Sequence, residues 1–98
     1  MIVIEGTVRI PGGRLESARP AMEAMIAASR AEGGCHEYAY SVDLLDSTLI
    51  RINERWESRA ALQDHFRSAH MAEWELAATT IGVTDHSLRL YDAEAEVL

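Results

Sequence analysis

The order in which the hydrophobic spacing changes along the chain restricts its fold more than any other feature. Four segments alternate apolar with polar residues, the period of a strand; they are residues 2–10, 35–43, 48–57 and 83–91. Two stretches, at about 14–32 and 58–81, repeat their apolar residues every three or four positions, the period of an amphipathic helix. The order strand–helix–strand–strand–helix–strand predicts an α+β, ferredoxin-like βαββαβ fold with an antiparallel sheet.

Turn and capping residues mark the borders of these segments. Glycines follow the first strand, the first helical stretch and the second helical stretch, where they favour a stop. Ser58 is a candidate N-cap, and a break near Ser68 divides the second helical stretch in two. Leu44 to Ser47 is expected to connect the two middle strands as a hairpin. Pro20 fits a helix that begins near Ser17, and it would kink a helix that begins earlier.

Length and charge limit the classes of function. The 98 residues make one domain, 1–98, with a modest core, so burial against a second copy in a homodimer is expected. Sixteen acidic residues against nine basic ones give a net charge of −7, which argues against nucleic acid and anionic membranes as partners. No apolar run is long enough for a membrane span. With Cys35 as the single cysteine and no secretion signal at the start, a cytoplasmic location is predicted.

The two faces of the predicted sheet differ. The helix-covered face is strongly apolar, with Ile2, Ile4 and Val8 on the first strand. The opposite face mixes charges of both signs, which suits solvent or a partner sheet whose charges pair across an interface; its charged residues are Glu5, Arg9, Arg51, Arg55, Asp85 and Arg89.

Several polar and aromatic side chains are expected on the helix-covered face. Glu54 and Trp56 are two apart on one strand and so project together. His65 lies on an apolar helical stripe, and Tyr38 points to the same side from the neighbouring strand. Further members of this group are Tyr40, Phe66, His70 and Trp74. An apolar enclosure with a few convergent polar groups is typical of a small-molecule site, although core packing is an alternative for the aromatic residues and for His65.

Other chemistries lack their motifs. His65 and His70 are five apart, a spacing that does not place two ligands on one helix face. There is no HExxH motif and no cysteine pair, so no metal is expected. A phosphate-binding glycine loop and a serine nucleophile elbow are also missing.

The order and spacing of certain residues resemble the antibiotic-biosynthesis monooxygenase family, and within it the quinol-monooxygenase-like branch. The resemblance is carried by Glu32-Gly33-Gly34-Cys35-His36-Glu37-Tyr38, by Glu54-Arg55-Trp56-Glu57-Ser58, and by Ala61, Leu62, His65, Ser68, His70 and Met71. It implies subunits that dimerise through their sheets into a dimeric α+β barrel. It also implies oxidation of phenols or quinols by dioxygen without flavin or metal. Haem-degrading relatives would have a histidine near Glu75 and an asparagine near Gly6, and this chain has neither.

The leading hypothesis is therefore a cofactor-independent monooxygenase that acts on a small aromatic substrate with dioxygen. His65 is the expected base, because its ordinary pKa lies near neutrality, and Glu54 would orient it or receive the proton through water. Trp56 and Tyr38 would stack on the substrate ring, and His70 would stabilise the oxyanion. Phe66 and Trp74 complete the predicted substrate-binding set. A binding module without turnover and an isomerase of the same fold are the alternatives.

Overall fold

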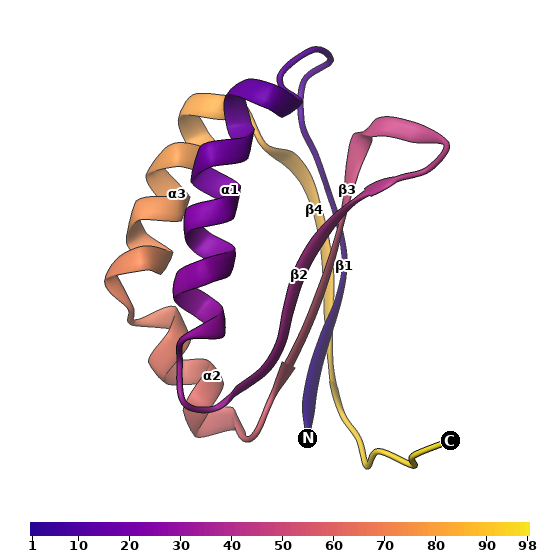
Figure 1. Cartoon of the computed structure of the whole chain (residues 1–98), viewed down its shortest axis with the longest axis vertical. Helices are drawn as coiled ribbons and strands as arrows, with labels where there is room; N and C mark the ends of the chain where they lie inside the picture. The colour runs from indigo at the N-terminus through magenta and orange to yellow at the C-terminus, as the bar shows by residue number, and fades with distance from the viewer.

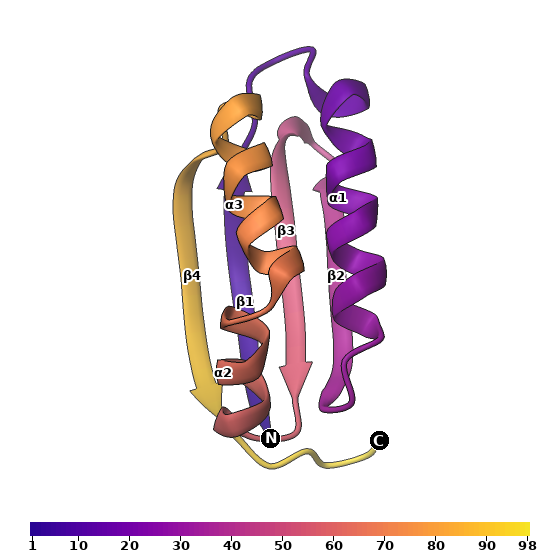
Figure 2. The same cartoon turned by 90° about the vertical axis from the view of Figure 1, so that its left-hand side faces the viewer.

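The computed structural model describes residues 1–98 and contains four strands and three helices (Figure 1). In chain order the elements are β1 (Ile2–Arg9), α1 (Leu15–Arg30), β2 (Cys35–Asp43), β3 (Asp46–Trp56), α2 (Arg59–Phe66), α3 (Ala69–Ile81) and β4 (Thr84–Asp92). The strands form one antiparallel sheet in the order β2-β3-β1-β4. All three helices lie on the same face of that sheet (Figures 1 and 2). The predicted α+β, ferredoxin-like fold is confirmed.

The serine caps explain why the second helical stretch is two helices. The Ser58 hydroxyl accepts the N–H of Ala61 at 3.1 Å at the start of α2. The Ser68 hydroxyl accepts the N–H of Met71 at 3.2 Å at the start of α3. Each cap satisfies a backbone donor that has no partner inside its helix. Gly82 then ends α3 with a φ of 93°, a left-handed conformation that glycine adopts without strain.

Helix α1 begins at Leu15, as the helical spacing from about residue 14 predicted, so Pro20 lies inside the helix, where it was expected to cause a kink. The ribbon of α1 nevertheless runs on without a break (Figure 2), and Pro20 is exposed, where water can bond the carbonyl that lacks a proline N–H. The hairpin between β2 and β3 is tighter than expected, because Asp46 already pairs with Asp43.

The core lies between the helices and the apolar face of the sheet. Strands β1 and β3 contribute most of it, as the alternating pattern predicted, and helix α1 covers it with Ala18, Met22 and Met25. The buried residues of the two central strands are Ile2, Ile4, Val8, Ile50, Ile52, Glu54 and Trp56. Glu54 is the one ionisable side chain in that set, and it therefore needs a partner inside the core.

Strand β4 is left uncovered at the edge of the sheet. Every residue of β4 is exposed, and its apolar Leu88 and Leu90 retain 44% and 41% of their accessible surface. Helix α3 lies over the centre of the sheet rather than over this edge (Figure 2). The sheet therefore offers an apolar strip beside α3 that the chain itself does not pack.

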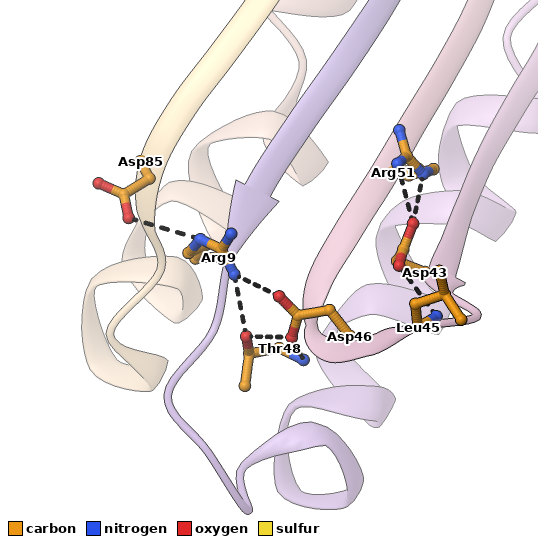
Figure 3. Close-up of polar contacts among 7 residues, drawn as sticks. All are labelled: Arg9, Asp43, Leu45, Asp46, Thr48, Arg51 and Asp85. Atoms are coloured by element: carbon orange, nitrogen blue, oxygen red, sulfur yellow. Dashed lines mark hydrogen bonds and ion pairs between the residues drawn. The ribbon is translucent and has the colours of Figure 1, made fainter.

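The outer face of the sheet carries mixed charges, as predicted, but many of them are already paired within the chain (Figure 3). Arg9 donates to Asp46 at 2.8 Å and lies 4.0 Å from Asp85. Arg51 donates to Asp43 at 2.8 Å. The Arg9 guanidinium and the Thr48 donors lower the pKa of Asp46 to about 2. These arginines therefore do not depend on a partner subunit for a counter-charge.

The helices of the chain are all too short or too polar to cross a lipid bilayer.

Candidate functional site

A cavity of about 530 Å³ lies between helix α3 and the β4 side of the sheet. Its floor comes from Ile4, Val8 and Ile52, and Leu88 and Leu90 of β4 form its outer wall. Most of the lining is apolar. The polar groups of its inner wall are Tyr38, Tyr40, Glu54 and His65. A largely apolar cavity with a few polar groups at one side suits a small aromatic molecule.

His65 is held by a carboxylate that comes from another part of the chain. Its Nδ1 lies 2.7 Å from Oε2 of Glu32, in the connection between α1 and β2. The same oxygen lies 2.8 Å from Nε2 of His70, in the first turn of α3. Two imidazoles therefore converge on one carboxylate oxygen. Because a carboxylate accepts hydrogen bonds, Nδ1 of His65 carries the proton, and Nε2 keeps its lone pair.

The environment of His65 favours the neutral ring. Its side chain is 2% exposed, and burial lowers its pKa below the ordinary value even though Glu32 acts in the opposite direction. The Trp56 ring packs against it with centroids 4.6 Å apart, and the Tyr38 ring lies 5.5 Å away. The one protein hydrogen bond of the ring is at Nδ1, so Nε2 has no protein partner. His65 thus brings an available proton acceptor to the wall of an apolar cavity.

Glu54 is bonded to Trp56 and not to His65. The indole Nε1 of Trp56 donates to Oε1 of Glu54 at 2.9 Å. Burial raises the pKa of Glu54, and the bond from Trp56 opposes part of that rise. The expected orienting contact from Glu54 to His65 is absent, and Glu32 makes it instead. Glu54 remains a carboxyl group in the cavity wall, 6% exposed and held in one position.

A pair of tyrosines occupies the wall beside Glu54. The hydroxyls of Tyr38 and Tyr40 are 2.9 Å apart, and burial raises the pKa of both phenols. Tyr40 also packs against Trp74 of α3, with ring centroids 5.7 Å apart. Both phenols therefore stay protonated near neutrality and can offer hydrogen bonds but not a negative charge.

The structure brings together five of the seven residues predicted for the site. Tyr38, Glu54, His65, Phe66 and Trp74 all line the cavity. Trp56 does not, because it is fully buried behind His65, and His70 does not, because its ring points to Glu32.

Sequence reasoning missed Glu32. It is the first residue of the Glu32–Tyr38 motif, yet nothing in its spacing connects it to His65, 33 positions later. The sequence feature that could have drawn attention to Glu32 is its position directly before Gly33 and Gly34, just after α1.

The β1–β4 pairing explains why position 6 carries glycine. A Cβ at Gly6 would collide with the backbone carbonyl of Ser87 in β4, and φ at Gly6 is +155°. Position 6 therefore has no room for a side chain such as the asparagine that the resemblance implies for haem-degrading relatives. Glu75, where that resemblance implies a histidine, lines the cavity.

Comparisons with known proteins agree with this fold. The model of the family "Antibiotic biosynthesis monooxygenase" matches residues 1–75. The structure superposes with a TM-score of 0.90 on a candidate antibiotic biosynthesis monooxygenase of Deinococcus radiodurans, at 24% identity over 100% of this chain and 97% of that one. A protein of Pseudomonas aeruginosa gives a TM-score of 0.82 at 25% identity, over 96% and 94% of the two chains. An uncharacterised protein of Synechocystis is 26% identical over 99% of this chain and 67% of its own length.

Proposed function

Because the chain belongs to the antibiotic biosynthesis monooxygenase family, we propose that it oxidises a small quinol or phenol with dioxygen and needs no bound cofactor. One observation carries the proposal. His65 is buried in the wall of an apolar cavity, with Nδ1 fixed by Glu32 and Nε2 without a protein partner. A proton acceptor next to an apolar space is what the first step of this oxidation requires.

The substrate supplies all the electrons. Dioxygen is a triplet and reacts slowly with closed-shell molecules, but removal of a phenolic proton makes the ring electron-rich enough to reduce it. For a quinol with a free ring position, one oxygen atom forms a new C–O bond and the other leaves as water. The products are a hydroxyquinone and one water molecule, and the four electrons that reduce dioxygen come from the quinol. No external reductant is needed.

The side chains around the cavity divide this work. His65 accepts the phenolic proton at Nε2, while Glu32 fixes the ring and stabilises the imidazolium that forms. The aromatic rings of Phe66 and Trp74 contact the substrate ring from the helix side. Tyr38 and Glu54 face the substrate's oxygen atoms, and Glu54 receives the proton in turn through water. Trp56 and His70 contribute from outside the cavity, through Glu54 and Glu32 respectively.

A second copy of the chain completes the enclosure in this proposal. Leu88 and Leu90 form the outer wall of the cavity while each keeps more than 40% of its surface exposed. Water at this wall would weaken every electrostatic interaction in the site. The family resemblance implies a homodimer formed through the sheets, and burial of the β4 edge in such a dimer would remove that water.

The test is oxygen consumption with menadiol, a small naphthoquinol, by chelator-treated protein in an oxygen electrode. We expect turnover by the wild type and a loss of at least about 100-fold in His65→Ala, the usual effect of removing a catalytic base. His36→Ala changes an exposed histidine of β2 and is the matched control. Unchanged turnover in His65→Ala would remove His65 from this role. Product formation without oxygen would instead identify an isomerase, and binding without oxygen uptake a carrier.

A further inference from the structure

Two imidazole nitrogens and one carboxylate oxygen meet at a single point beside the cavity. The three groups come from three separate elements: Glu32 from the connection after α1, His65 from α2 and His70 from the start of α3. Their ligating atoms all lie within 4.8 Å of one another. Two nitrogen ligands and one oxygen ligand are a donor set that suits zinc and related transition metals, whereas magnesium and calcium prefer oxygen ligands alone.

We propose that Glu32, His65 and His70 form a binding site for one divalent transition-metal ion, with Zn²⁺ as the representative ion. A tetrahedral zinc site with bonds of about 2.0–2.1 Å needs its ligand atoms roughly 3.3 Å apart. The two contacts to Glu32 Oε2 are now 2.7 and 2.8 Å. That oxygen would have to move away from each ring by about half an ångström, and the two ring nitrogens, which now lie within 4.8 Å of each other, would have to come to the same separation of roughly 3.3 Å.

The positions of the ligands allow this movement. The side chains of Glu32 and His70 are 18% and 21% exposed, and Glu32 lies in a connection rather than inside a helix. His65 is the fixed ligand, because Trp56 and Tyr38 pack against it. Water from the exposed side of His70 supplies the fourth position. The net charge of −7 raises the local concentration of cations around the chain.

The ion would inhibit the proposed oxidation, and this consequence rests on the proposed function. A metal at Nδ1 of His65 moves the ring proton to Nε2, because a neutral imidazole that ligates through one nitrogen carries its hydrogen on the other. Nε2 can then no longer accept a proton from a substrate. Metal binding and base catalysis thus use the two nitrogens of one ring and exclude each other.

The first experiment is a calorimetric titration of chelator-treated protein with Zn²⁺ at about pH 7.5, above the ordinary pKa of histidine. We expect one ion per chain, and at least about 100-fold weaker binding in His70→Gln and in Glu32→Gln, since each variant removes a ligand. His36→Gln removes an exposed histidine outside the cluster and should bind like the wild type. Mg²⁺ should give no saturable heat. No stoichiometric binding, or unchanged affinity in both ligand variants whose melting curves show a folded chain, overturns the site.

A second experiment separates the site from the proposed reaction. If the wild type oxidises menadiol, stoichiometric Zn²⁺ should stop oxygen uptake and a chelator should restore it. Stoichiometric binding with unchanged oxygen uptake overturns the inhibition. The calorimetric result does not depend on turnover, so an inactive protein that binds Zn²⁺ through these three residues supports the metal site and contradicts only the proposed oxidation.

Discussion

The buried bond from Trp56 to Glu54 should be worth more than an ordinary hydrogen bond. Trp56→Phe removes the indole donor, whose 2.9 Å contact is the only protein hydrogen bond to the Glu54 carboxyl. Loss of a hydrogen bond to a charged group costs about 1.5–3 kcal/mol. The smaller ring also leaves roughly 40 Å² of core surface without contact, or about 1 kcal/mol at the usual 25 cal/mol per Å². We therefore expect Trp56→Phe to lower the free energy of unfolding by about 3 kcal/mol.

A double-mutant cycle isolates the bond from the packing. Glu54→Met removes the acceptor while it keeps a side chain of similar length, and the double variant removes both partners. The coupling energy between the two positions should be about 1.5–3 kcal/mol. Urea unfolding measures it, with Trp74 as the remaining fluorophore and all chains at one concentration, because assembly shifts apparent stability. A coupling energy below about 0.5 kcal/mol, the range of independent sites, would refute this reasoning.

Other positions give further predictions. Burial raises the pKa of Glu54, so the folded chain binds more protons than the unfolded chain, and wild-type stability falls as pH rises from the ordinary carboxyl pKa to the raised one. Glu54→Gln keeps an acceptor for Trp56 but does not titrate, so its melting temperature should gain on that of the wild type more at about pH 7 than at about pH 4. Equal gains at the two pH values would contradict the raised pKa. Gly6→Ala should cost about 2 kcal/mol or more, because its Cβ meets the Ser87 carbonyl; near-neutral urea unfolding would show that β4 moves away freely. Ser58→Ala should cost about 1 kcal/mol by the same assay through the lost cap of α2, whereas Ser58→Asp, which can still cap, should cost much less. Sedimentation equilibrium should give twice the chain mass of 10.9 kDa, and a monomer at micromolar concentration would rule out the proposed closure of the cavity by a second copy.

The fold was predictable because its signals are local. Alternation along β1 and β3 determines which side chains enter the core, and the observed burial of Ile4, Ile52 and Glu54 follows that alternation. The cap at Ser58 and the break near Ser68 were also readable, because a capping side chain acts on residues three positions away. Local spacing could not decide whether Pro20 breaks its helix, because a proline inside a helix is tolerated where water reaches the carbonyl that it leaves unbonded.

The site was only partly predictable because its contacts join distant segments. Periodicity places Trp56 on the correct face, yet it cannot tell a residue in a cavity wall from one packed behind the wall. The bond between Glu32 and His65 depends on how the end of α1 approaches α2, which no spacing encodes. The five-residue spacing of His65 and His70 argues against shared ligation only within one helix, and these two residues lie on two helices.

The most direct test of the proposed oxidation is the fate of the oxygen atoms. Chelator-treated wild-type protein is supplied with menadiol and ¹⁸O₂, and the product is weighed by mass spectrometry. We expect one ¹⁸O atom per product molecule and almost no product with His65→Ala. In a parallel reaction with ordinary dioxygen in ¹⁸O-labelled water, we expect no label in product that is collected before its carbonyl oxygens exchange with water. An unlabelled product, or a labelled product formed equally fast by His65→Ala, would contradict oxidation in the cavity with the buried histidine as its base.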